Sequence, residues 1–234
     1  MIVLGLSAYV HDSAACLVID GVLKGNVEEE RFNRQKHTAA FPLLSIQYLL
    51  QKNGISLSDV DVIAFNWNPW LSLASETLKW LFSPHIAVQV RRLGLSPKNW
   101  GSIGNSIRLG KAFEKHFPGE FEGRIEWVDH HIAHAASSYY ISPFNRLPAY
   151  SLVVDGSGDT ASTTLFAING NKFLKIKSWP ISDSLGILYS SVTQFLGLKA
   201  HEEGKTMALA AYGENNYKDE FQKILELTGG VSHC

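Results

Sequence analysis

The hydrophobic positions at the start of the chain are arranged as three short strands. Residues 2–6 and 14–19 are apolar runs, and residues 22–27 would form a third strand after Asp20-Gly21, a dipeptide typical of hairpin turns. Apolar residues then recur at helical spacing over residues 43–52, between a proline and a glycine. The beginning of the chain therefore predicts an antiparallel meander followed by a helix.

The same pattern returns in the second half of the chain. Residues 151–154 and 160–168 predict two strands, Asn169-Gly170-Asn171 predicts a turn, and residues 173–177 predict the return strand. Asp12 and Asp159 hold matching places in the two copies, which sets the offset at 147 residues. A repeated meander followed by helices indicates a duplicated α/β fold.

Two further strands and a helical insertion are expected between the meanders. Residues 60–65 and 125–128 are the strands, and residues 70–117 carry Leu, Trp and Arg at roughly helical spacing. Asp129 is well placed to cap a helix after the second strand, because its side chain can accept a hydrogen bond from the first helical turn.

The repeat divides the chain into two expected subdomains. Residues 1–146 hold the first copy with its insertion, and residues 147–234 leave the second copy without room for its last strands and helix. We expect this truncated copy to expose an apolar face or a sheet edge, either of which favours a homo-oligomer.

Composition narrows the class of protein. The 234 residues are 45% hydrophobic, which excludes global disorder, and the net charge of −1 argues against a nucleic-acid binder. No apolar run is long enough to span a membrane, and the first residues lack the basic region of a secretory signal. Cys16 and Cys234 cannot form a disulfide framework. We expect a cytoplasmic protein with no nucleic-acid or membrane partner.

The strongest chemical signal is a cluster of histidines: His130, His131 and His134. On a helix, His130 and His134 lie on one face and can share a metal ion, whereas His131 is turned toward a supporting or substrate-contacting position. Asp155, at the carboxyl end of a predicted strand, is the best third ligand, and Asp159 is the alternative. Imidazole and carboxylate together suit Fe, Zn, Mn or Ni.

The glycine-rich loop after Asp155 predicts an anion contact. Gly156, Ser157 and Gly158 let the backbone approach a bound anion closely, although an ordinary polar loop has the same composition.

Further candidates lie outside these two motifs. His11 occupies the matching loop of the first copy and suits general-base catalysis. Lys36 belongs to a charged run, residues 28–37, which is either a solvated surface or a contact to an anionic substrate. Glu203 and Lys205 precede an Ala-rich helix that we expect to end at a Gly213 cap, and both could contact substrate.

Five motifs, taken together and in order, resemble the N-terminal part of the O-carbamoyltransferases of nodulation-factor and antibiotic biosynthesis. They are GLSAYVHDSAACLVIDG, VEEERFNRQKH, VDHHIAHAASSYY, VVDGSGDT and EEGKTMALAAYG. The resemblance spans almost the whole chain. It implies an actin-like fold built from two ribonuclease-H-like halves, with the second half incomplete here.

The resemblance also implies a reaction. In this family a C-terminal YrdC-like domain, without a counterpart in these residues, makes carbamoyl adenylate from carbamoyl phosphate and ATP. The carbamoyl group then moves to a hydroxyl of a small-molecule or sugar acceptor. A divalent metal, iron first and zinc or manganese otherwise, is implied at His130, His134 and Asp155, with His11 catalytic and Lys36 near the transfer site.

The sequence departs from the family pattern at two places, and two other functions remain open. Tyr9 stands where some members carry an aspartate, and a further metal aspartate of the family has no counterpart here. A phosphotransferase of the same superfold is one alternative, although Mg²⁺ rarely takes imidazole ligands. A non-catalytic, truncated binding module is the other.

Overall fold

The computed structural model divides the chain into two compact units, Met1–Ile187 and Leu188–Cys234. The residues it describes are 1–71, 104, 107–199 and 201–224. Most of the predicted helical insertion over residues 70–117 lies outside this range. The division into units does not test the predicted boundary between residues 146 and 147, which stays a prediction.

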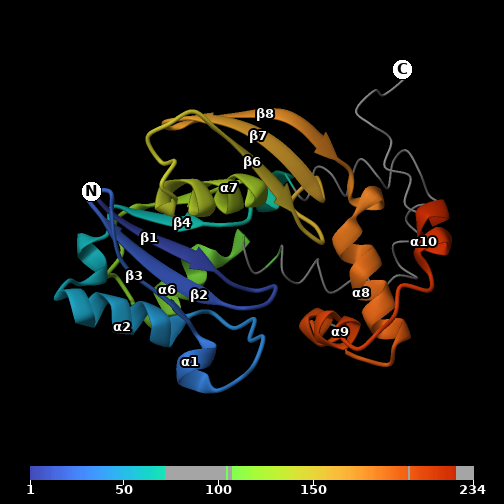
Figure 1. The fold of residues 1–234 in the computed structure, drawn as a ribbon. Helices are drawn as coiled ribbons and strands as arrows, with labels where there is room; N and C mark the ends of the chain where they lie inside the picture. Colours follow the sequence, from blue (N-terminus) through green and yellow to red (C-terminus); the bar gives the residue numbers. More distant parts are fainter. Residues whose placement is uncertain (72–103, 105–106, 200, 225–234) are drawn as a thin grey trace. The chain divides into compact units, whose positions relative to one another are not determined.

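The first unit opens with a five-stranded sheet in the order β3-β2-β1-β4-β5 (Figure 1). β1, β2 and β3 form the predicted antiparallel meander, and β4 and β5 continue the sheet parallel to β1. The strands are Ile2–Ser7 (β1), Ala14–Ile19 (β2), Val22–Glu28 (β3), Val62–Phe65 (β4) and Arg124–Trp127 (β5). Asp20 and Gly21 both adopt positive φ, 50° and 78°, as the two-residue hairpin turn requires.

Two helices pack on this first sheet and complete its core (Figure 1). α2 (Leu43–Asn53) ends at Gly54 in the left-handed conformation, as its flanking residues predict, and α6 (Leu109–His116) precedes β5. Short helical turns, α1 (Glu30–Asn33) and η1 (Leu57–Asp59), connect these elements. Fully buried side chains of the core include Leu4, Leu17, Ile46, Leu49, Ile63, Phe65 and Phe113.

A second, three-stranded sheet repeats the meander in the order β6-β7-β8. Its strands are Ala149–Val154 (β6), Thr163–Asn169 (β7) and Lys172–Trp179 (β8), all antiparallel to their neighbours. Both meanders carry an irregular register in the middle of the second strand, at Leu17/Val18 and at Leu165/Phe166. The α/β class and the repeated meander are therefore confirmed.

Among the residues that the structure describes, α7 (His130–Ile141) covers one face of the second sheet. It packs on the sheet through a small core that includes Ala135, Tyr139 and Phe166 (Figure 1). The opposite face leaves five large apolar side chains between 49% and 78% exposed. They are Tyr150, Leu152 and Val154 on β6 and Leu174 and Ile176 on β8. A role of these side chains in self-association stays a prediction.

Helices make up the chain after the second sheet. η2 (Ile181–Asp183) leads into α8 (Leu185–Phe195), and α9 (Glu203–Ala210) and α10 (Lys218–Ile224) belong to the second unit. α9 ends at Ala210 rather than at a Gly213 cap. Ala211 keeps right-handed dihedrals and its N–H bonds to the helix, so no left-handed glycine is needed. Among the described residues, no helix combines the length and apolarity needed to cross a membrane.

Candidate metal centre

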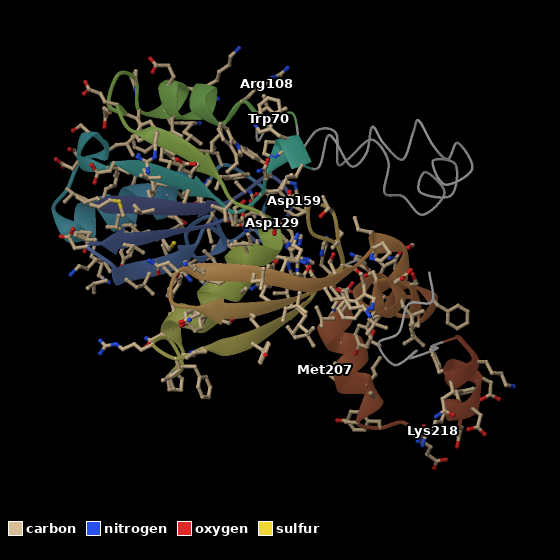
Figure 2. All side chains as sticks on the ribbon, turned by 90° about the horizontal axis from the view of Figure 1, so that it is seen from above. Trp70, Arg108, Asp129, Asp159, Met207 and Lys218 are labelled. Atoms are coloured by element: carbon tan, nitrogen blue, oxygen red, sulfur yellow. The ribbon has the colours of Figure 1, made fainter. Side chains whose placement is uncertain are left out.

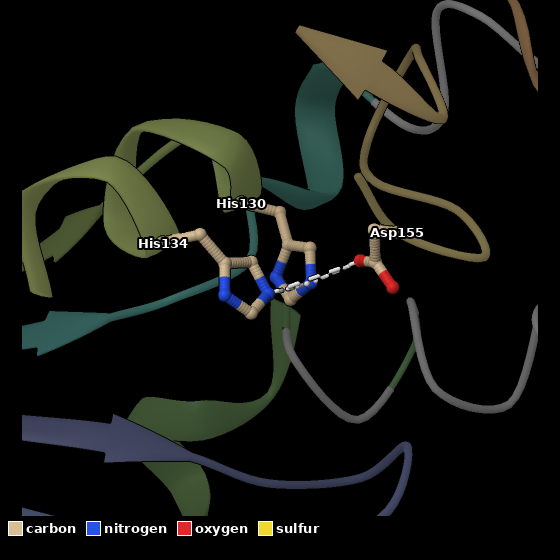
Figure 3. A group of neighbouring side chains, drawn as sticks. All are labelled: His130, His134 and Asp155. Atoms are coloured by element: carbon tan, nitrogen blue, oxygen red, sulfur yellow. Dashed lines mark hydrogen bonds and ion pairs between the residues drawn. The ribbon is translucent and has the colours of Figure 1, made fainter. Parts of the chain in front are cut away.

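The histidine cluster lies at the start of α7, directly after β5. Asp129 caps this helix as predicted, with its side chain accepting the N–H of Ile132 at 3.0 Å. His130 is the first helical residue, so His134 lies one turn further along the same face (Figure 3). Asp155 follows the end of β6 and faces both rings (Figure 3).

Three potential ligand atoms converge at this point. His130 Nε2 lies 3.1 Å from Asp155 Oδ2 and 3.2 Å from His134 Nε2. His134 Nε2 and Asp155 Oδ2 are 3.8 Å apart, and one ligand atom from each of the three residues lies within 4.8 Å of the others. Two imidazoles and a carboxylate at these separations fit a first-row transition metal by donor type.

The tautomer of His130 suits metal binding. Its Nδ1 lies 2.9 Å from the carbonyl oxygen of Asn66, which can only accept, so Nδ1 carries a proton and donates it. The lone pair of neutral His130 is then on Nε2, the atom that faces the cluster. Trp67 flanks the same ring, with centroids 4.5 Å apart. The loop after β4 thus orients the ring as outer-shell partners orient metal-bound histidines.

The pKa shifts in the cluster indicate that it stabilises a positive charge. Burial alone would lower the pKa of His130, but its hydrogen bonds to Asp155 and Asn66 outweigh burial and raise the pKa. Burial likewise opposes ionisation of Asp155, yet the bond from His130 lowers its pKa. Burial, then the charge of His130, lower the pKa of His134. The negative charge of Asp155 thus favours a positive charge at this point of the cluster, where a cation would lie.

Asp159, the alternative third ligand, is used differently. Its carboxylate is 5% exposed and accepts two backbone N–H groups, from Asn68 at 3.0 Å and from His130 at 2.8 Å. Asp159 thus contacts the first residue of the helix that Asp129 caps; Figure 2 labels both aspartates. Asp155 therefore offers the ligand atom, while Asp159 holds the backbone of His130.

His131 points away from the cluster and packs inside the protein. The ring is 3% exposed, and its Nδ1 lies 2.7 Å from the hydroxyl of Thr164 on β7. Gly158 packs against the ring so closely that a Cβ there would come within 2.6 Å of it. This burial favours the supporting role that the spacing allows for His131, and a contact to substrate stays a prediction.

The glycine-rich loop after Asp155 also contacts Ser184 and Gly186. The Ser184 hydroxyl donates to the carbonyl of Gly156 at 2.7 Å, and the Gly156 N–H donates to Asp155 Oδ1 at 2.6 Å. Gly186 approaches so closely that a Cβ there would lie 2.7 Å from Gly156. Gly156 and Ser157 stay half-buried, whereas Gly158 is buried. An anion contact by Gly156 and Ser157 stays a prediction.

His11 belongs to a separate group of side chains. Its Nδ1 lies 2.9 Å from Asp12 Oδ2, and His37 Nδ1 lies 3.0 Å from Asp12 Oδ1. The sequence singles out His11, but the pairing of Asp12 with His37 joins residues 25 apart and has no local signal. The catalytic role of His11 stays a prediction.

The remaining candidates are surface groups. Lys36 is 76% exposed, pairs with Glu30 at 2.6 Å, and lines a shallow pocket with Arg31 and Arg34. Glu203 and Lys205 belong to the second unit, where Glu203 accepts the Ser190 hydroxyl and Lys205 pairs with Glu202. Substrate contacts by Lys36, Glu203 and Lys205 stay predictions.

Comparisons of the sequence with known proteins identify relatives of this chain. An uncharacterized protein of Synechocystis sp., sll1178, is 38% identical over 93% of this chain and 35% of its own length. Nodulation protein NolNO of Sinorhizobium fredii is 34% identical over 94% of this chain and 31% of its own length. A tRNA N6-adenosine threonylcarbamoyltransferase of Chlamydia abortus is 25% identical over 96% of this chain and 58% of its own.

Two of these relatives are much longer than the chain. It spans about a third of the Synechocystis and Sinorhizobium proteins. A family model, carbamoyltransferase N-terminus, matches residues 2–230. The chain therefore belongs to the carbamoyltransferase N-terminal family.

Proposed function

We propose that this chain carries the transfer site of an enzyme that moves a carbamoyl group from carbamoyl adenylate to a hydroxyl of a small-molecule or sugar acceptor. The observation that carries the proposal is the convergence of His130, His134 and Asp155 beside a glycine-rich loop. Family membership supports carbamoyl transfer. The likeness to a nodulation protein supports the resemblance to the O-carbamoyltransferases of nodulation-factor biosynthesis, and the sugar acceptor is taken from that resemblance.

The three converging residues would hold one divalent cation, iron first and zinc or manganese as alternatives. A cation there would neutralise the negative charge of the adenylate phosphate. The protein's own contribution is to hold the ligand atoms in place: Asn66 fixes the His130 ring, and Asp159 fixes its backbone. The half-buried Gly156 and Ser157 would contact the phosphate beside them.

His11 would act as the general base. The acceptor oxygen forms a bond to the carbamoyl carbon, and the acceptor proton moves to Nε2 of His11. The bond from that carbon to the phosphate oxygen breaks, and AMP leaves with the electron pair. Base assistance of this kind accelerates a reaction by about 10²–10⁴-fold. Lys36 and Lys205 would contact the anionic carbamoyl adenylate, and Glu203 would accept a hydrogen bond from a hydroxyl of the reactants.

Metal content tests the site directly. We expect His134→Ala to lose most bound metal in elemental analysis, because one of three ligand atoms disappears. His201→Asn is the control, since His201 is exposed, lies in the second unit, and already has a positive φ that asparagine tolerates. Equal metal in His134→Ala and the control would place the site elsewhere.

Transfer is tested with a supplied activating domain. The metal-loaded chain, mixed with a separately purified domain that forms carbamoyl adenylate, should carbamoylate members of a panel of hydroxyl acceptors. His11→Asn should lower kcat by about 10²-fold or more. If the metal-loaded chain fails to bind a stable carbamoyl adenylate analogue in calorimetry, the proposed function is wrong.

A further inference from the structure

Two segments far apart in the sequence meet at Asp12. The loop between β1 and β2 is joined to the segment after α1 by two backbone bonds, from the Tyr9 N–H to Ala39 at 3.0 Å and from the Ser13 N–H to Thr38 at 2.9 Å. Between these bonds, one oxygen of Asp12 faces His11 and the other faces His37. The carboxylate is therefore shared by two imidazoles.

The contacts at Asp12 set the tautomer of both rings. An ionised carboxylate can only accept hydrogen bonds, so His11 and His37 both donate an Nδ1–H to it. Burial opposes ionisation of Asp12, but the hydrogen bonds of the two histidines lower its pKa. Each neutral ring then carries its lone pair on Nε2, the nitrogen a general base uses. Both rings stay about half exposed, at 48% and 46% of their side-chain surface.

The backbone around this group is unusual. Tyr9, Asp12 and His37 have positive φ values of 74°, 49° and 54°. Residues with a side chain rarely adopt this conformation, and it persists where surrounding contacts impose it. Three such residues around one carboxylate indicate that the two loops are held in this arrangement by specific contacts, as functional sites often are.

We propose that Asp12 is a positioning residue for His11 and that His37 fixes Asp12 in turn. This inference rests on the proposed function, in which Nε2 of His11 takes the acceptor proton. The imidazolium formed then faces Asp12 Oδ2, which stabilises the charge, as the aspartate of a catalytic triad does. His37 occupies the other oxygen, so the carboxylate cannot rotate away from His11.

NMR of the histidine side chains tests the positioning. Asparagine tolerates the left-handed backbone, but its amide offers one acceptor oxygen where the carboxylate offers two. In Asp12→Asn the two rings must share that oxygen, so the population of His11 with a proton on Nδ1 falls. Asp20→Asn is a matched control, because Asp20 has a φ of 50° in the same meander and its side chain accepts a bond from the amino group of Met1 rather than from a histidine.

Kinetics separate positioning from binding. With the supplied activating domain, Asp12→Asn should lower kcat by about 10²-fold or more while the acceptor KM changes less than about threefold. His37→Asn, which frees one carboxylate oxygen but keeps the bond to His11, should lower kcat by a smaller factor. An unchanged His11 tautomer in Asp12→Asn would overturn the inference, and so would wild-type kcat. A changed tautomer in a chain that transfers nothing would support the positioning by Asp12 and contradict the proposed function instead.

Discussion

The backbone N–H of His130 donates to Asp159 Oδ2 at 2.8 Å, while the ring of the same histidine faces Asp155 Oδ2 at 3.1 Å. Two aspartates of one loop thus contact the same histidine, Asp159 at its backbone and Asp155 at its ring. A side chain that is fixed through its backbone and through its ring has little freedom to leave the cluster, so we expect Asp159 to support the proposed metal site without contacting the ion.

Asp159→Asn should weaken both the fold and the metal site. The amide nitrogen would face one of the two backbone N–H groups, leaving that buried donor without an acceptor, at a cost of about 1–3 kcal/mol. Metal affinity should fall by about 10–100-fold, as for other changes in the support of metal ligands. Urea unfolding and calorimetric metal titration measure the two effects.

Asp129→Asn is the matched control for this prediction. Asp129 caps the same helix, but asparagine is an equally good N-cap, so the change should cost little. If Asp159→Asn behaved like Asp129→Asn in both measurements, the bond between Asp159 and His130 would not support the site.

Metal affinity should decrease as the pH falls. Its bonds to Asp155 and Asn66 raise the pKa of His130 above the ordinary value despite burial, so the protonated ring persists to higher pH than in a free histidine. A metal must displace that proton, so affinity is full above the raised pKa and falls as the pH drops through it. Metal titrations between about pH 8 and about pH 6 should show this loss. A constant affinity across this range would contradict the role of His130 as a ligand.

Gly158→Ala should disturb the loop far more than Gly156→Ala. A Cβ at Gly158 would lie 2.6 Å from the His131 ring, which is buried and bonded to Thr164 and therefore has little room to move. A Cβ at Gly156 would meet no atom within 4 Å. We expect Gly158→Ala to lose about 1–3 kcal/mol of stability through overpacking, and Gly156→Ala to lose much less.

Thermal unfolding and metal titration of the two glycine variants give the comparison. Equal losses in both would show that the contact between Gly158 and His131 does not shape the loop. Loss of metal affinity in Gly158→Ala alone would connect this packing to the position of Asp155, three residues earlier.

The sequence predicted those features that depend on residues close together in the chain. The Asp20-Gly21 turn, the Asp129 cap and the spacing of His130 and His134 each depend on a few neighbouring residues, and the structure contains all three. The sequence ranked Asp155 above Asp159 because Asp155 stands directly at the end of the strand, and the structure brings the Asp155 carboxylate to the two rings. The sequence could not show that Asp159 accepts the backbone N–H of His130 instead.

Other features depend on contacts between distant segments. Nothing near His131 in the sequence indicates that the ring is buried against Thr164, 33 residues away. The link from Asp12 to His37 likewise appears only when the loop after β1 lies beside the segment after α1. Helical spacing placed His131 off the metal-facing side but could not tell a supporting role from substrate contact.

The exposed face of the second sheet should drive self-association of this chain. Leu152 and Leu174 are 61% and 67% exposed, and large apolar patches on a surface favour contact with another apolar surface. Leu152→Thr combined with Leu174→Thr keeps β propensity while removing much of the apolar area, so self-association should weaken by about tenfold or more. Sedimentation velocity over a range of concentrations measures the dissociation constant.

Lys172→Thr, at an exposed polar position of the same sheet, is the control and should leave the dissociation constant unchanged. A wild-type chain that stays monomeric at high concentration, or a double variant that associates as strongly as the control, would show that this face does not mediate association.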